Sequence, residues 1–330
     1  MRRAPLIALL LAAAALAQPE QLKIGAIDFY GYAGLDLDAI RARLTLHIGE
    51  MVSKDQMPAL IDRIKQSTKA TAVETVCCGA QGGLLVYIAL PGQSARDVPY
   101  NAAPKGTARL PEAATKLYQQ FTDALMQAVT KGNAAEDDSH GYALFKDPAT
   151  RAKQLAMREY ALHHENAIRR VLASSGDGGQ RAIAAELMGY TRRSQAQIAA
   201  LVKASQDPDS EVRNNATRAL WVMAASNPKT AARIPAAGFI EMLYSPSWTD
   251  RNKSSALLEA LTRSRNPKLL QTLRDQAREP LVEMARWHNP GHAYAARLIL
   301  GRCAGIPEGQ LAKLVAADDP SPILAALHTK

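Results

Sequence analysis

Cysteine is scarce in this chain, with Cys77, Cys78 and Cys303 the only 3 among 330 residues. Three cysteines cannot build a disulfide scaffold, and the side chains of the adjacent pair would point to opposite faces of a strand. No two cysteines have the C-x-x-C spacing that usually marks a redox centre. A redox protein is therefore a minor alternative, and at least one thiol is expected to stay free or to pair between molecules.

Aromatic residues are also few, at 5% of the chain. After the first residues, no apolar run approaches the roughly 20 residues that a membrane-spanning helix needs. Abundant alanine and leucine favour helices packed closely through small side chains over a large β-sandwich. The length allows more than one hydrophobic core. We expect a mostly helical protein with no transmembrane segment once its leader is removed.

The sequence motifs of common enzymes are missing. There is no G-x-S-x-G, no P-loop and no dinucleotide-binding fingerprint, and Gly79, Gly82 and Gly83 lie in an expected hairpin. Serine, histidine and aspartate residues are present, but their spacing does not mark a triad. We predict no catalytic residues and no cofactor.

Residue types that bind metals occur in three groups, which are 136–138, 163–165, and His288 with His292. The first group, which is acidic, does not follow the EF-hand spacing. Neighbours on a helix diverge by about 100° per residue, so the second group cannot converge on one ion unaided. Pro290 and Gly291 interrupt the helix that would align the two histidines of the third. We predict no metal site.

The first residues have the pattern of a secretory signal peptide. Arg2 and Arg3 form a positive segment, residues 6–15 are apolar, and Ala15-Leu16-Ala17 has the small-x-small pattern of a cleavage site. No cysteine follows that site, so lipid attachment is not indicated. We predict that residues 1–17 are removed and that the protein is exported, into a bacterial periplasm. An uncleaved anchor is the alternative.

The formal net charge of +9 falls to about +7 without Arg2 and Arg3, which would suit a nucleic-acid-binding protein inside a cell. Export argues against nucleic acid, and no basic block is longer than the pairs Arg169-Arg170 and Arg192-Arg193. We expect no nucleic-acid partner and interpret these pairs as solvated helix faces. Weak contact with anionic lipid or acidic partners is the alternative.

Residues 22–90 are predicted to form a small α+β domain in the order β-α-α-β-β, with a three-stranded sheet. The expected strands are 22–29, 72–78 and 84–90. Between the first two strands, capping signals at Asp36 and Ser53 each precede apolar residues at helical spacing. A glycine-rich hairpin loop, residues 79–83, joins the last two strands.

This order of elements resembles a POTRA domain, the polypeptide-transport-associated module of outer-membrane assembly proteins. The resemblance is carried by Ile24, Ile27, Phe29 and Gly31, which lead into a capped helix followed by LTLHIGEMVS. It covers about 70 residues, although the family usually sits beside a barrel or anchor that this sequence does not show.

The POTRA resemblance implies that the second strand is a sheet edge that accepts an extended peptide. The residues concerned are Val73, Glu74, Thr75 and Val76. The alternative is an edge that is solvated or covered by residues 91–110.

The middle of the chain is expected to connect two domains. Residues 91–110 are rich in proline and poor in apolar residues, which predicts a linker. Residues 111–140 are predicted to form a linker helix, up to about Lys131, and an acidic loop.

Residues 207–220 resemble the second half of a HEAT repeat. Asp207 can cap a helix and Pro208 suits its first position, after which Val212, Ala216 and Leu220 fall on one apolar face. The resemblance implies close packing of successive helices through small residues.

The same pattern recurs along the chain at Arg181, Arg213, Arg251 and His292. The resemblance implies an all-α HEAT-like solenoid over residues 147–330 that presents a protein-binding face. Arg181, Arg213, Asn214 and Arg251 are the candidate residues of that face. A non-repetitive helical domain is the alternative.

These features together predict an exported, non-enzymatic scaffold at the cell envelope. It would bind other proteins or extended peptide segments through the strand edge and a helical-repeat groove. The alternative is a HEAT-like repeat enzyme or a small-ligand-binding sensor in the periplasm. Converging His, Asp or Glu side chains in one pocket would favour the enzyme.

If the leader is cleaved after Ala17, the periplasmic protein begins at Gln18. The Ala17→Arg variant should keep its leader, because the cleavage site requires small residues. N-terminal sequencing of the exported protein and intact mass of both forms check this. A periplasmic protein that begins at Met1 would contradict it.

Overall fold

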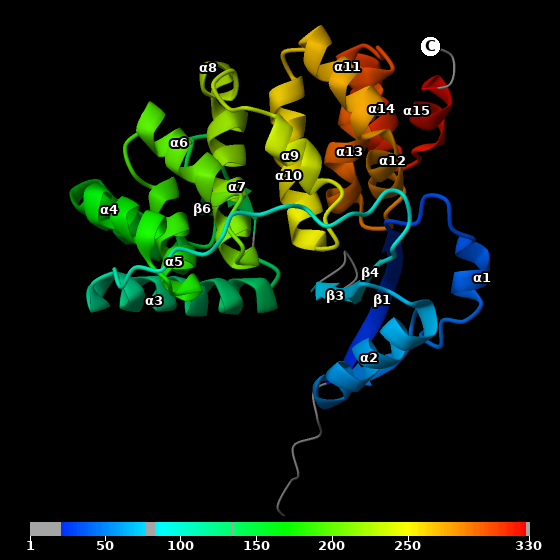
Figure 1. Cartoon of the computed structure of the whole chain (residues 1–330), viewed down its shortest axis with the longest axis horizontal. Coiled ribbons are helices and arrows are strands. Elements are labelled where there is room, and N and C mark those ends of the chain that lie inside the picture. The colour runs from blue at the N-terminus through cyan, green and yellow to red at the C-terminus, as the bar shows by residue number, and fades with distance from the viewer. Residues whose placement is uncertain (1–20, 77–82, 134, 328–330) are drawn as a thin grey trace, which may run out of the picture.

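The computed structural model describes residues 21–76, 83–133 and 135–327. Within these ranges the chain is mostly helical, with a small mixed sheet followed by many helices (Figure 1). The predicted signal peptide, Cys77, Cys78 and most of the predicted hairpin loop lie outside the described residues.

The N-terminal sheet has four strands in the order β2-β1-β4-β3, not the predicted three. They are β1 Gln21–Tyr30, β2 Met51–Ser53, β3 Ala72–Val76 and β4 Leu84–Ala89. β1 and β4 are parallel, and the two outer pairs are antiparallel. The additional strand is β2, which ends at Ser53, the residue predicted to cap a helix. Its side chain makes no capping hydrogen bond, and a 3-10 turn at Lys54–Gln56 precedes the helix.

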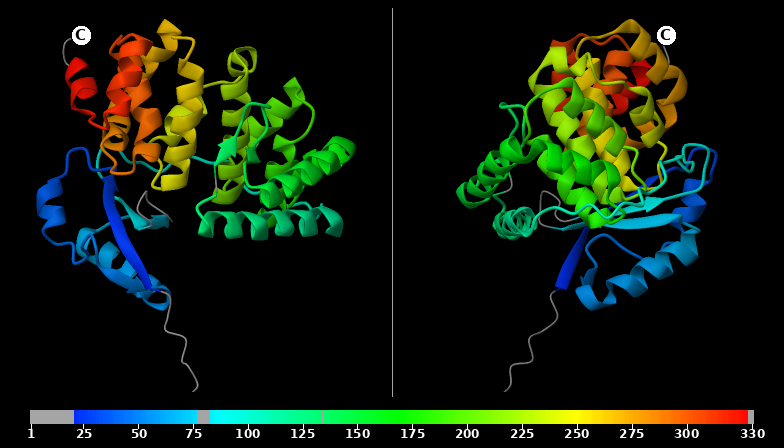
Figure 2. Two further views of the ribbon diagram at one scale, coloured as in Figure 1. Left: turned by 180° about the vertical axis from the view of Figure 1, so that it is seen from behind. Right: turned by 60° about the vertical axis from the view of Figure 1, so that its left-hand side comes forward.

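Two short helices, α1 Leu37–Arg41 and α2 Met57–Thr68, contribute to the core on one face of the sheet. The predicted cap Asp36 is confirmed, because its carboxylate accepts the Ala39 N–H. α1 is a short helix that ends at Arg41. The opposite face of the sheet packs against later helices, so the sheet lies between α2 and the rest of the chain (Figure 2).

The helical array follows from residue 112. Its helices are α3 Glu112–Thr130, α4 Pro148–Ser174, α5 Gly178–Gly189, α6 Gln195–Ala204, α7 Ser210–Ser226, α8 Pro228–Ala231, α9 Ala237–Met242, α10 Trp248–Thr262, α11 Pro267–Gln276, α12 Arg278–Ala285, α13 Pro290–Cys303, α14 Glu308–Ala316 and α15 Ser321–Ala326. Four of them, α5, α7, α10 and α13, pack successively side by side, and we call these the inner helices.

The predicted acidic loop contains regular structure. β5 Glu136–Asp137 pairs antiparallel with β6 Leu144–Phe145, forming a small hairpin after α3. Gln154 of α4 holds this hairpin, because its side-chain oxygen accepts the Phe145 N–H at 2.7 Å. The correction matters for function, since the hairpin fixes Glu136 against the inner helices.

Residues 91–110, predicted as a linker, form an extended strap across the turns that precede α5, α7 and α10 (Figure 1). Strap N–H groups of Arg96 and Asn101 donate to carbonyls of the turns before α10 and α7, at 3.1 and 2.8 Å, and the Gly106 N–H donates at 2.8 Å to the last carbonyl of α4. The strap is therefore held by backbone hydrogen bonds along the array. Its prolines suit this role because they favour extended backbone.

Glu283 of α12 joins the sheet to the helical array. Its buried carboxylate accepts the N–H groups of Gly31, Tyr32 and Ala33, which follow β1, at 2.7, 2.9 and 3.0 Å. It also accepts the Ser94 hydroxyl and lies 3.5 Å from the Arg251 guanidinium. One carboxylate thus connects β1, the strap and two helices.

Replacing Glu283 should destabilise the whole protein. Glu283→Ala leaves a buried arginine without its carboxylate and the Gly31 and Tyr32 N–H groups without an acceptor, so we expect a loss of about 3–5 kcal/mol in the free energy of unfolding. Glu241→Ala removes a half-exposed partner of Arg96 and should cost about 1 kcal/mol or less. Urea denaturation of both variants measures the difference, and equal losses would contradict this role for Glu283.

Candidate functional site

The predicted strand edge is present, since β3 ends the sheet. The backbone groups of successive residues in β4 point alternately to β1 and to β3. The Leu90 N–H, just after β4, donates to the Tyr30 carbonyl of β1. The even-numbered residues of β4 therefore hydrogen-bond to β1, and the odd-numbered residues hydrogen-bond to β3. By this alternation, Val73 and Thr75 direct their backbone N–H and C=O groups away from the sheet. In the part of the chain that the structure describes, no other strand pairs with that side.

Glu74 on the same strand has a structural role. Its carboxylate accepts the Trp248 N–H at 2.7 Å, at the beginning of α10, and lies 3.5 Å from the Thr249 hydroxyl. Burial raises the pKa of this carboxyl group. Val76 is partly buried against the array. Of the four predicted edge residues, Val73 and Thr75 therefore offer outward backbone, while Glu74 and Val76 attach the strand to the helices.

The predicted arginine face is wrong, because Arg181, Arg213 and Arg251 are buried, with exposed fractions of 2%, 5% and 0%. They occupy equivalent positions at the starts of α5, α7 and α10. Each guanidinium donates to a carbonyl six residues earlier, at 3.0, 2.9 and 2.7 Å respectively. The side chains therefore point into the array, and of the four predicted residues only Asn214 is partly exposed.

Each of these arginines also reaches a carboxylate that lies later in the chain. Arg181 pairs with Asp207 at 2.8 Å and Arg213 with Asp250 at 2.9 Å. The prediction that Asp207 caps α7 is therefore wrong. Asp209 caps that helix, accepting N–H groups of its first turn. An inward guanidinium can satisfy a buried carboxylate and a turn carbonyl together, which explains why these arginines are not at the surface.

A charged cluster that the sequence patterns did not reveal lies beside the inner helices. It consists of Glu136, Asp138, Glu186, Arg218 and Lys253. The Arg218 guanidinium on α7 is 2.9 Å from Glu136 of the hairpin and 3.9 Å from Glu186 of α5. The five residues come from the hairpin and three helices, so no local spacing could mark them.

The cluster changes the protonation of its members. Burial, reinforced by the nearby Arg218 charge, lowers the pKa of Lys253 to about 8. Burial, reinforced by Glu136, raises the pKa of Asp138 to about 6. Within the described ranges the Lys253 amine makes no hydrogen bond or ion pair. A raised carboxyl pKa and a lowered amine pKa in one cluster are more frequent at functional sites than elsewhere.

The histidines near α13 hold the sheet in place. Asn289 caps α13, so His288 lies just before the helix and His292 lies in its first turn. His288 Nδ1 lies 2.7 Å from Asp28, and His292 Nδ1 lies 2.6 Å from the Tyr87 hydroxyl. Burial and the Lys253 charge lower the pKa of His292 to about 4, so the Tyr87 hydroxyl donates to a neutral ring.

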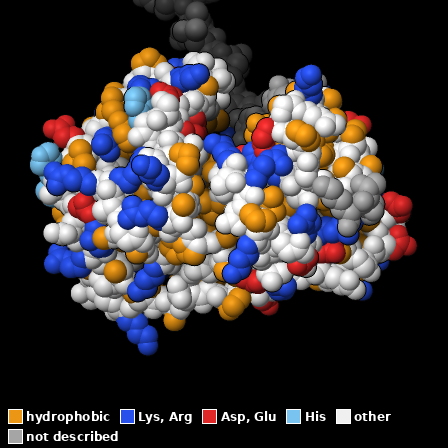
Figure 3. Space-filling model, turned by 90° about the horizontal axis from the view of Figure 1, so that it is seen from above, with side chains coloured by type: hydrophobic (Ala, Val, Ile, Leu, Met, Phe, Trp, Pro, Cys, Tyr) orange, Lys and Arg blue, Asp and Glu red, His pale blue; other side chains and the backbone are white. Residues whose placement is uncertain are grey.

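One face of the molecule carries its basic charge in dispersed form. On the face shown in Figure 3, Lys and Arg side chains are spread among apolar ones and do not gather in one block.

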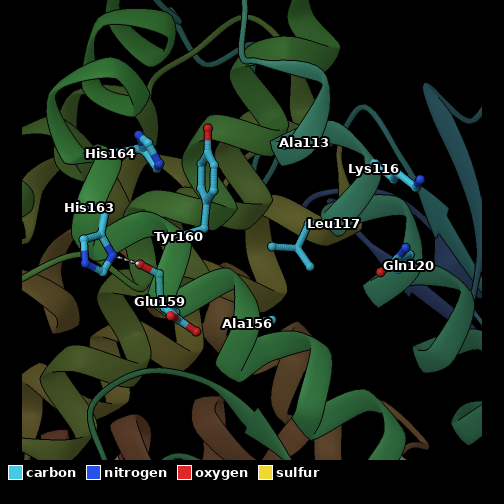
Figure 4. Close-up of a pocket in the computed structure, with 9 residues that line it drawn as sticks. All are labelled: Ala113, Lys116, Leu117, Gln120, Ala156, Glu159, Tyr160, His163 and His164. Carbon is cyan, nitrogen blue, oxygen red and sulfur yellow. Dashed lines mark hydrogen bonds between the residues drawn. The ribbon is translucent and has the colours of Figure 1, made fainter.

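A shallow hollow of about 480 Å³ lies between α3 and α4 (Figure 4). Leu117 of α3 faces Tyr160 and His164 of α4, whose rings are 4.2 Å apart. The His163 ring bonds the Glu159 carbonyl. No three His, Cys, Asp or Glu side chains come together as metal ligands anywhere in the described ranges. The hollow offers stacking and apolar contact.

Comparison with protein-family models found no match, and comparison with curated proteins found no similar sequence. Across residues 21–76, 83–133 and 135–327, no helix combines the length and apolar character needed to cross a membrane. Cys303 is buried and free, and burial raises the pKa of its thiol to about 11.

Lys253 should lower stability at neutral pH. Because its pKa is lower in the folded chain than in the unfolded chain, folding disfavours the charged amine below about pH 8. Lys253→Met should therefore raise the free energy of unfolding at pH 7 by about 1–3 kcal/mol. Between about pH 8 and 10.5 the folded chain has already lost this proton and the unfolded chain loses it as the pH rises, so the gain should shrink over that range.

Lys268→Met, at an exposed lysine, is the matched control. Urea denaturation across this range tests both variants, and a gain that does not depend on pH would contradict the assignment.

Proposed function

We propose that this protein is an exported, non-enzymatic scaffold that binds other proteins or extended peptide segments at the cell envelope. The outward backbone of Val73 and Thr75 carries this proposal, because a free strand edge is complementary to an extended chain. The resemblance of residues 22–90 to a POTRA domain supports the same mode of binding. The proposed site is the edge of β3 beside the start of α10.

We also propose that residues 147–330 form a HEAT-like solenoid. The equivalent contacts of Arg181, Arg213 and Arg251 support a repeated unit, since each links one turn to a carboxylate further along the chain. The face available to a partner would be formed by partly exposed side chains such as Asn214 of α7, and not by the buried arginines.

Attachment of the sheet to the array makes the two parts a joint surface. Glu74 lies against the N-terminus of α10, so a peptide added to β3 would lie beside that helix. The signal-peptide pattern supports a periplasmic location, and the dispersed basic side chains would permit weak contact with anionic surfaces. The charged cluster around Lys253 favours a small-ligand sensor or enzyme as the second candidate function.

The strand edge can be tested by removing only its outward N–H groups. The Val73→Pro/Thr75→Pro variant loses two outward donors, and the ladder to β4 uses the other residues of the strand. Val73→Ala/Thr75→Ala keeps both donors and controls for the shortened side chains. Crosslinking of the mature chain in envelope extracts, followed by mass spectrometry, should recover a reproducible partner with the alanine variant and at least about tenfold less with the proline variant.

Circular dichroism and urea denaturation first establish that both variants fold. A partner retained equally by both would move the proposed site to the helices. If the unaltered protein captures no reproducible partner, the scaffold proposal fails.

A further inference from the structure

A histidine held by a buried carboxylate lies between β1 and the start of α13. Asp28 of β1 is buried, and its carboxylate lies 2.7 Å from Nδ1 of the His288 ring. The same carboxylate accepts the His288 backbone N–H at 3.0 Å. The backbone contact would by itself hold the turn against the sheet. The ring contact has a further effect, because it fixes the orientation and the tautomer of the imidazole.

The other ring nitrogen of His288 is available for chemistry. A carboxylate accepts hydrogen bonds, so Nδ1 carries the proton and Nε2 of the neutral ring keeps its lone pair. The His288 side chain is 59% exposed, and within the described residues Nε2 has no hydrogen-bond partner. His288 is therefore a base that a buried carboxylate orients and that solvent can reach.

The ring of His288 lines a cleft of about 300 Å³, which is large enough for a small molecule. Ile48, Leu85 and Pro290 give the cleft apolar walls, and Lys23 supplies a cation. Among the described residues, no serine, threonine or cysteine lines it. The nucleophile available to a substrate in this cleft is therefore water.

We propose that His288 and Asp28 form a general-base dyad that hydrolyses a small carboxylic ester bound in this cleft. His288 Nε2 takes a proton from water as the water oxygen attacks the ester carbonyl carbon. Lys23 stabilises the negative charge that develops on the carbonyl oxygen. The C–O bond to the alcohol then breaks, and the imidazolium gives its proton to the departing oxygen. The products are a carboxylic acid and an alcohol, so no oxidant or reductant is needed.

A second histidine shows what the carboxylate contributes. His163 is also exposed and lines the hollow between α3 and α4 together with Lys116, but its Nδ1 bonds the neutral Glu159 carbonyl at 2.8 Å. A neutral carbonyl can orient a ring, whereas a carboxylate also stabilises the imidazolium that forms when the ring takes a proton. Asp28 is thus a positioning residue, and His163 is the matched control for His288.

Hydrolysis of p-nitrophenyl acetate by the full mature chain near neutral pH tests the dyad. Repeated turnover distinguishes hydrolysis from acylation of lysine side chains, which is stable. His288→Gln should lower kcat/KM at least about tenfold, whereas His163→Gln should leave it within about twofold. Equal kcat/KM values for the unaltered chain and His288→Gln, or no turnover above the rate in buffer, would overturn the proposal.

Two further variants separate the roles. Asp28→Asn should lower kcat about tenfold or more with KM nearly unchanged, because an amide cannot balance the charge of the imidazolium. A merely structural Asp28 would change the folded fraction, measured by circular dichroism and urea denaturation, but not kcat per folded chain. Lys23→Met should lower kcat/KM about tenfold or more, because it removes the cation that faces the developing charge. An unchanged kcat in either variant would remove that residue from the mechanism.

The dyad goes beyond the proposed scaffold function, since turnover would add hydrolysis to binding. Asp28 and His288 lie on β1 and before α13, and the assay does not involve the outward edge of β3. Failure of the assay would therefore leave the strand-edge proposal standing, and failure of the crosslinking experiment would leave the dyad untouched.

Discussion

The fold depends on arginines that face inward at the starts of successive inner helices. Each guanidinium binds a carbonyl of its own turn and a carboxylate further along the chain, so it fixes the spacing between helices while keeping buried charge compensated. Arginine suits this position because its planar donors reach both groups at once, which a lysine ammonium cannot reproduce with the same geometry. Loss of one partner would leave a buried charge uncompensated, so breaking even one of these pairs would strongly destabilise the fold.

The last arginine of this series also determines where the sheet lies. Arg251 donates to the Ser94 carbonyl of the strap at 2.7 Å and approaches Glu283, which in turn binds the backbone after β1. The same network that spaces the helices therefore attaches the N-terminal sheet. As a result, the β3 edge and the charged cluster have fixed places relative to α10, although they serve separate proposals.

Local patterns predicted part of the local structure. Asp36 caps α1, and the spacing around Leu60 and Ile64 gave the buried face of α2. Partners distant in the chain were not predictable, because spacing carries no information about them. The sequence predicted Arg181 as a surface residue and Asp207 as a helix cap. In the fold the two side chains form an ion pair. The same limit hid the charged cluster, and β2 was too short to show any alternation.

The strap and the Glu283 junction have a consequence for how the chain folds. The Gly31–Glu283 hydrogen bond joins residues 252 positions apart, and the Arg251–Ser94 bond spans 157. Contacts of such separation close late, because the entropy of a large loop must be overcome before they form. During synthesis the sheet cannot dock until α12 has left the ribosome. The final contacts of this chain require its last third, so the chain stays incompletely folded for longer. An incompletely folded polypeptide is the form that can be threaded across a membrane.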